Sequence, residues 1–140
     1  MTKVVYNACY GGFSLSKEAV YRYWEIKGQQ VWIEDELWGF NVYLVPPEER
    51  LKPKSTKEFT NMSMDERMTY NKAYSAQTWY NCHVDRHDPV LVQVVEELGD
   101  KANGDYAKLR IAEVSGPYRI TEYDGFESVK TPDNVNWIVP

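Results

Sequence analysis

The spacing of apolar residues divides the chain into short elements. Several runs are dominated by β-branched and aromatic residues and bounded by Gly, Pro, Asn or Asp, a pattern typical of strands. These runs predict strands at residues 3–9, 31–34, 40–45, 109–114, 118–123, 126–129 and 136–139. Apolar residues three and four positions apart predict helices at residues 16–27, 64–77 and 88–99.

Local signals mark where the helices begin. A Gly-Gly pair separates the first strand from the first helix, and Ser14 or Ser16 can cap that helix. Ser63, with Glu66 three residues later, has the pattern of a capping box. The dipeptide Asp88-Pro89 combines a capping carboxylate with a proline in the first turn.

Up to residue 129 the order of the elements is β-α-β-β-loop-α-α-β-β-β, and residues 136–139 would add a last edge strand. This order predicts an α+β fold: a mixed β-sheet of about five to six strands, with helices packed mainly on one face. A length of 140 residues fits a single domain, 1–140, and is short for two ordinary domains. Residues 46–62 are rich in Pro, Glu, Lys, Ser and Thr, and predict a long surface loop.

Composition narrows the function classes. The formal net charge is −5 and Lys and Arg are scattered, which disfavours a nucleic-acid partner. Apolar runs are too short for a membrane helix, the N-terminal residues lack the apolar segment of a signal peptide, and there are two cysteines. These features predict a cytoplasmic protein with free thiols and no membrane partner. The 11 Tyr and 5 Trp exceed what one small core needs, so some rings are expected to stack on a ligand or fill an interface.

The first candidate site is the Gly-rich segment that joins the first strand to the first helix. The free amides of a helix N-terminus attract phosphate or carboxylate, and glycine lets the backbone approach an anion closely. The segment has neither the P-loop lysine nor the third glycine of a dinucleotide fingerprint. The alternative is a tight turn with a helix cap. The ligand-binding prediction covers Asn7, Cys9, Tyr10, Gly11, Gly12, Phe13 and Ser14.

Two further segments carry polar chemistry. Residues 82–88 contain Cys, His and Asp, but their spacing fits no common zinc motif, so no metal is predicted. Arg86 is the ligand candidate of this segment, because its planar cation can bind an anion through two hydrogen bonds. Residues 122–127 place Tyr123 and Asp124 around an Asp-Gly hairpin turn, where three acids suit acid–base chemistry or hydrogen bonds to a ribose. A solvated hairpin tip is the alternative.

Cysteine chemistry is the remaining possibility. A helix N-terminus lowers a thiol pKa, so Cys9 is a potential nucleophile, with His83 or His87 as its base. A buried strand cysteine is the structural alternative. No catalytic residue is assigned from the sequence, and no cofactor is predicted.

Three stretches resemble a widespread family of small uncharacterised phage and prophage proteins. They are Asn7-x-Cys-Tyr-Gly-Gly-Phe-Ser-Leu-Ser, Asp85-Arg-x-Asp-Pro-x-Leu-Val-x-Val-Val-Glu-Glu-Leu-Gly, and Glu122-Tyr-Asp-Gly-x-Glu together with residues 103–114. The chain departs from the family after Glu127, where Ser128 to Asp133 replace a His- and Glu-containing tail. The resemblance implies a phage origin.

Small phage proteins often counter host defence, and one strategy is to sequester a nucleotide-derived immune signal. By this analogy the chain is expected to be a binding protein, with phosphate at the Gly-rich segment, a contact from Arg86, and a base stacked on Tyr10 or Trp79. The weak apolar face of the helix at 64–77 and the many surface rings predict a homo-oligomer. A hydrolase of a phosphate-containing small molecule, using Cys9 or the 122–127 acids, and a protein-binding inhibitor of a host factor are the alternatives.

Overall fold

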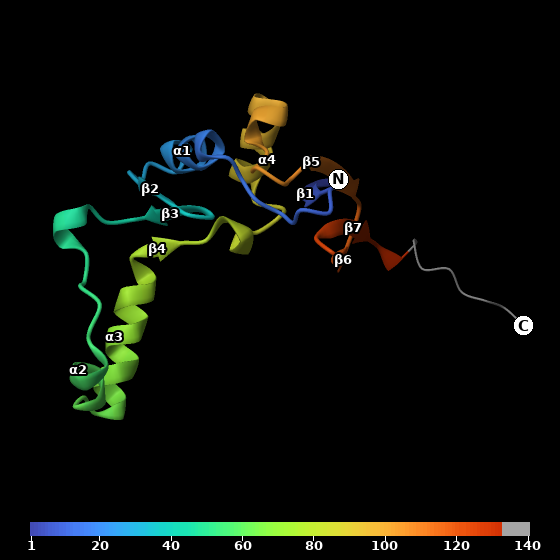
Figure 1. Ribbon diagram of the computed structural model, residues 1–140. Coiled ribbons are helices and arrows are strands. Elements are labelled where there is room, and N and C mark those ends of the chain that lie inside the picture. Colours follow the sequence, from blue (N-terminus) through green and yellow to red (C-terminus); the bar gives the residue numbers. More distant parts are fainter. Residues whose placement is uncertain (133–140) are drawn as a thin grey trace, which may run out of the picture. The chain divides into compact units, whose positions relative to one another are not determined.

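The computed structural model describes residues 1–132, which fall into two compact units (Figure 1). One unit contains residues 1–28 together with the chain from Asn81 onward, and the other contains residues 29–80. The strand expected at 136–139 lies outside the described residues. The single-domain assignment stays a prediction.

The first unit is built on two antiparallel strand pairs and two helices. β1 (Thr2–Asn7) pairs with β5 (Leu109–Val114), and β6 (Arg119–Tyr123) pairs with β7 (Phe126–Lys130). The helices are α1 (Lys17–Ile26) and α4 (Pro89–Leu98). Short 3-10 turns, η2 (Asn81–His83) and η3 (Gly99–Ala102), precede and follow α4.

β1 lies at the centre of the core of this unit. Val4 and Val5 are both fully buried although their side chains alternate across the strand, because β1 contacts both α4 and β7. The apolar stripes of α1 and α4 pack against each other, as their spacing predicts. Their buried members are Ala19, Val20 and Tyr23 on α1 and Leu91, Val92, Val94 and Val95 on α4.

The second unit is a small sheet with a helical extension. β2 (Trp32–Glu36), β3 (Gly39–Tyr43) and β4 (Thr78–Trp79) form an antiparallel sheet in that order. The expected surface loop 46–62 has no buried residue, but it contains a 3-10 turn, η1 (Pro47–Glu49), and a short helix, α2 (Thr56–Thr60). Neither α2 nor β4 was predicted, because α2 has few apolar residues and β4 has only two residues.

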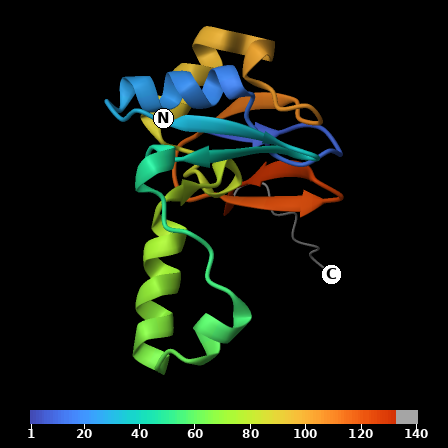
Figure 2. The same cartoon turned by 60° about the vertical axis from the view of Figure 1, so that its left-hand side comes forward.

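Helix α3 (Met64–Ala76) begins with the predicted capping box at Ser63 and has no buried residue. Figure 2 shows the segment that contains α2 running beside it. Arg67 donates to the carbonyls of Phe59 and Thr60, and the Tyr70 hydroxyl donates to the carbonyl of Lys52. Hydrogen bonds to backbone carbonyls therefore hold this segment to α3. A helix of this length is usually stabilised by an apolar face packed on a core, which α3 lacks.

The predicted α+β class is confirmed, and the seven strands within residues 1–132 form three small sheets. All their pairings are antiparallel, whereas one mixed sheet was expected. β1 and β7 contact each other without forming a ladder, since the carboxylate of Glu127 accepts the Asn7 amide at 2.8 Å. Packing of the helices on one face stays a prediction. No helix within residues 1–132 is long and apolar enough to cross a membrane.

The carboxylate of Asp88 joins α1 to α4. It caps α4 by accepting from the Val90 amide at 2.9 Å, accepts from the Tyr23 hydroxyl at 2.7 Å, and lies 3.0 Å from Lys27 Nζ. Burial alone would raise the pKa of Asp88, but the hydrogen bonds from Tyr23, Lys27 and Val90 together lower it below its ordinary value.

We predict that this carboxylate makes folding stability depend on acid. A lowered folded-state pKa means that the contribution is complete above the unfolded-state pKa and is lost as pH falls through the folded-state value, below about pH 4. Asp88→Ala should lower the free energy of unfolding at neutral pH by about 1 kcal/mol or more. It should also reduce the loss of stability between about pH 6 and pH 3, measured by urea unfolding. Asp105→Ala is the exposed control, and equal pH profiles for the two variants would contradict the assignment.

Candidate functional site

The Gly-rich segment between β1 and α1 is fixed by contacts with distant parts of its own unit. The Ala8 amide donates to the Lys108 carbonyl at 2.8 Å, and the Leu15 amide donates to Asn81 Oδ1 at 3.2 Å. Ser16 is the helix cap: its Oγ accepts from the Ala19 amide, and its own amide donates to a carbonyl of η3 at 2.9 Å. The Ser16 amide at the N-terminus of α1 is therefore already hydrogen-bonded to η3. This leaves fewer free amides there to bind an anion.

The glycines of this segment allow close packing of the chain. A Cβ on Gly11 would lie 2.2 Å from Tyr106 Cβ. A Cβ on Gly125, in the β6–β7 turn, would lie 2.5 Å from the Gly12 nitrogen and 2.6 Å from the Tyr10 carbonyl oxygen. Both distances are shorter than side chains tolerate. These approaches explain Gly11 and Gly125 without a ligand, and the φ of 88° explains Gly12, as the tight-turn alternative proposes.

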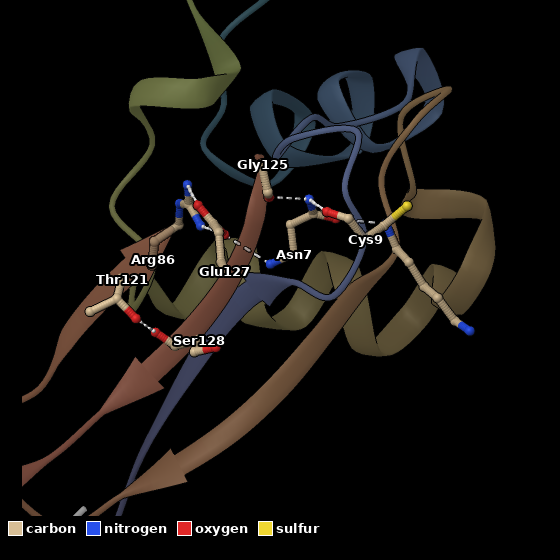
Figure 3. Close-up of polar contacts among 8 residues, drawn as sticks. Asn7, Cys9, Arg86, Thr121, Gly125, Glu127 and Ser128 are labelled. Atoms are coloured by element: carbon tan, nitrogen blue, oxygen red, sulfur yellow. Dashed lines mark hydrogen bonds and ion pairs between the residues drawn. The ribbon is translucent and has the colours of Figure 1, made fainter. Parts of the chain in front are cut away.

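Beneath this segment, a buried ion pair connects β7 to the chain before α4 (Figure 3). Glu127 Oε1 accepts from Arg86 Nη1 at 2.5 Å and from the Asn7 amide at 2.8 Å, while Oε2 accepts from Arg86 Nη2 at 2.9 Å. The side chains of Glu127 and Arg86 are 6% and 15% exposed. In this setting the bidentate geometry and the extra amide donor offset the desolvation of the charges.

The side chain of Asn7 completes this network. Its Nδ2 donates to the carbonyls of Cys9 at 2.7 Å and Gly125 at 2.8 Å, and its Oδ1 accepts from the Lys108 amide at 2.8 Å. Asn7 is fully buried, and both ends of its amide are satisfied. One asparagine thus links the Gly-rich segment, the β6–β7 turn and the start of β5.

Arg86 is also engaged through the face of its guanidinium. Its Cζ lies 3.6 Å from the centroid of the Phe13 ring, and its carbonyl accepts from the Val5 amide at 2.9 Å. The fork that would grip a phosphate is directed at Glu127. The structure thus brings Asn7, Phe13 and Arg86 together as a packing network, and a ligand contact from Arg86 stays a prediction.

Three exposed tyrosines lie on or next to elements that contact the segment. Tyr10, Tyr106 and Tyr123 are 66%, 73% and 75% exposed. Tyr10 is on the Gly-rich segment, Tyr106 abuts Gly11, and Tyr123 pairs across the hairpin with Phe126, whose ring centroid lies 5.2 Å from that of Tyr10. Tyr106 was not predicted; its proximity depends on the Gly104 amide bonding the Ser14 carbonyl at 3.0 Å, a long-range contact.

The three acids of residues 122–127 occupy different environments. Glu127 is buried, whereas Glu122 and Asp124 are exposed. Asp124 and Gly125 have φ angles of 50° and 86°, as a tight hairpin turn requires, so the predicted turn is confirmed. Glu127 was predicted only as part of an acidic turn, because its burial depends on Arg86, 41 residues away.

Groups with nucleophilic or metal-binding chemistry do not form an obvious centre. Cys9 is half-buried and Cys82 is exposed. His87 Nδ1 lies 2.6 Å from the Tyr118 hydroxyl and 3.0 Å from Asp85, and burial followed by the Asp85 charge raises the pKa of Tyr118. Within residues 1–132, no group of three or more His, Cys, Asp and Glu side chains is placed to hold a metal ion.

We predict that the buried ion pair is a major source of stability. Glu127→Gln leaves the Arg86 guanidinium largely buried without a charged partner, and should lower the free energy of unfolding by about 3 kcal/mol. Glu122→Gln is the matched control, since Glu122 faces Glu127 across the same hairpin but is exposed. Urea unfolding of both variants checks this, and a loss below about 1 kcal/mol for Glu127→Gln would contradict it.

The second prediction concerns the close approach at Gly125. Gly125→Ala and Gly28→Ala both place a Cβ at positive φ, 86° and 76°, which strains the backbone by about 1–2 kcal/mol. Only the Cβ at Gly125 also meets neighbouring backbone, since nothing lies within 4 Å of that at Gly28. Thermal unfolding should show a clearly larger loss for Gly125→Ala. Equal losses would mean that the turn does not pack against the Gly-rich segment.

Comparisons with family models, curated proteins and solved structures give no match for this chain. The resemblance to the phage family therefore stays a prediction.

Proposed function

We propose that this protein is a small binding module that sequesters a nucleotide-like ligand against the Gly-rich segment. The ligand stacks on the rings of Tyr10, Tyr106 and Tyr123. That the ligand is a host immune signal rests on the resemblance to phage proteins, and is part of the proposal.

The observation that supports this proposal is the exposure of three tyrosines on and beside the Gly-rich segment. Tyr10 lies within the segment, Tyr106 abuts Gly11, and Tyr123 is paired with Phe126, whose ring contacts that of Tyr10. An exposed tyrosine offers a flat face with few rotatable bonds, and stacking of a base on such a ring contributes about 1–3 kcal/mol. The Gly-rich segment and the β6–β7 turn, next to Tyr10 and Tyr123, are held together by hydrogen bonds of Asn7 and Glu127. A rigid support lowers the entropy lost when a ligand is bound.

For the charge partner of the ligand we propose a residue other than Arg86, whose ligand contact the sequence predicts. Because Arg86 is committed to Glu127 and Phe13, we assign it a positioning role under the site. Lys108 is exposed and two residues from Tyr106, and its backbone groups bond Asn7 and Ala8. It is therefore the cation that we assign to a ligand phosphate.

The hydrogen bonds of Glu127 and His87 favour a binding role over the hydrolase alternative. Glu127 has its oxygens committed to Arg86 and Asn7, and His87 bonds Tyr118 and Asp85. Two of the groups expected to act as acid or base, Glu127 and His87, are thus occupied in hydrogen bonds within the fold.

We predict that the tyrosines carry the affinity. Tyr10→Ala, Tyr106→Ala and Tyr123→Ala should each weaken nucleotide binding by about 1–3 kcal/mol, roughly 5- to 150-fold, in calorimetric titrations with purine mononucleotides and cyclic dinucleotides. Tyr21→Ala is the matched control, a tyrosine on α1 that is 47% exposed. An unchanged affinity in all three site variants would refute the stacking site.

Incubation with each nucleotide, followed by denaturation and mass spectrometry, separates holding from cleavage. Recovery of intact nucleotide in near-stoichiometric amount supports sequestration. Recovery of a degraded product would identify a hydrolase. Empty protein with the nucleotide intact in solution would remove both small-molecule functions.

A further inference from the structure

The tip of the β2–β3 hairpin presents two large apolar side chains to solvent. Leu37 and Trp38 are 85% and 90% exposed and form the two-residue turn between the paired residues Glu36 and Gly39. Contiguous exposed leucine and tryptophan at a protruding tip are unfavourable in water, and they mark interaction sites when no fold requirement explains them.

The turn itself does not require these residues. Two-residue hairpin turns favour Asn, Asp and Gly, as Asp124-Gly125 illustrates in the β6–β7 hairpin of the same chain. Asp124 is the only non-glycine residue within 1–132 with positive φ, so Leu37 and Trp38 lie in ordinary backbone conformations that polar residues adopt equally well. Local folding therefore does not explain an apolar pair at this tip.

Side-chain contacts hold the two strands of the hairpin, and so fix the backbone that carries Leu37 and Trp38. Glu34 bonds Arg50 Nη1 at 2.6 Å, and the Arg50 guanidinium lies 3.6 Å from the Tyr43 ring centroid. At the other end of the strand pair, Glu36 accepts from the Asn41 side chain. A tryptophan on such a support loses little freedom when bound, which is typical of binding hot spots.

Charge defines the kind of partner. Residues 29–45 contain the three acids Glu34, Asp35 and Glu36 and no Lys, Arg or His. Glu34 pairs with Arg50 at 2.6 Å, so Asp35 and Glu36 are the acids that give the hairpin end its net negative charge. This charge disfavours an anionic membrane surface and also a second copy of the chain, whose net charge is −5. It complements a pocket with an apolar floor and a basic rim.

We propose that the Leu37-Trp38 tip is a protein-docking element that inserts into an apolar pocket rimmed by Lys and Arg on a partner protein. Trp38 fills the pocket, Leu37 seals its edge, and Asp35 and Glu36 face the basic rim. This interaction is separate from the ligand site of the other unit, and goes beyond the proposed function.

The test begins with a benzophenone amino acid at position 37, cross-linked in cells that natively make the protein. The same amino acid at position 64 is the control, because Met64 is 69% exposed but lies on α3. The polypeptide cross-linked from position 37 but not 64 is identified by mass spectrometry, purified, and titrated with the intact chain by fluorescence anisotropy.

Trp38→Ala should weaken this binding by about 30-fold, the effect of removing a hot-spot tryptophan. Asp35→Asn combined with Glu36→Gln should lower the affinity and flatten its salt dependence, while Met64→Ala leaves both unchanged. Because Trp38 and Met64 are exposed, Trp38→Ala and Met64→Ala should keep the parent unfolding temperature, and the double variant is titrated at a temperature at which circular dichroism shows it folded.

Four outcomes would overturn the proposal. The first is an adduct between two copies of the chain, and the second is a blue shift of tryptophan emission with phosphatidylcholine vesicles that Trp38→Ala abolishes. The third is the absence of an adduct specific to position 37. The fourth is a purified partner whose affinity Trp38→Ala does not change. The first identifies a self-association element, and the second a lipid-inserting tip.

Discussion

The buried carboxylate of Glu127 is the interaction on which the first unit depends. It accepts two hydrogen bonds from Arg86 and one from the amide of Asn7, and so joins β7, the chain before α4 and the end of β1. A carboxylate is stable at 6% exposure only when donors replace its water, and these three do so. With β7 fixed in this way, Gly125 can approach Gly12 and the Tyr10 ring can reach Phe126.

The two units are stabilised by different physical means. The first has a closely packed apolar core in which β1 is covered on both faces. The helical extension of the second has no buried residue, and is held by Arg67 and Tyr70 hydrogen-bonded to backbone carbonyls. Segments without buried apolar contacts open at low free energy, so the extension should exchange its amide hydrogens before the core of the first unit does.

The network also changes how a ligand would be recognised. A strand, a Gly-rich segment and a helix N-terminus together favour an anion site, but η3 binds the Ser16 amide and Glu127 occupies Arg86. Tyr10, Tyr106, Tyr123 and Lys108 are among the residues left exposed there, and the proposed ligand is therefore planar and anionic. The β2–β3 hairpin shows the reverse case. Polar residues would fit its turn, yet the turn carries the exposed apolar residues Leu37 and Trp38.

The sequence by itself determined the elements whose signals are local. Ser63 and Asp88 cap helices and Asp124-Gly125 forms a turn, because each depends on neighbours within a few residues. Only the tertiary structure decided that Glu127 is buried, that Arg86 is its partner and that Tyr106 meets Gly11. These contacts join residues from 41 to about 100 positions apart, and no periodicity or turn chemistry specifies which distant segments pack together.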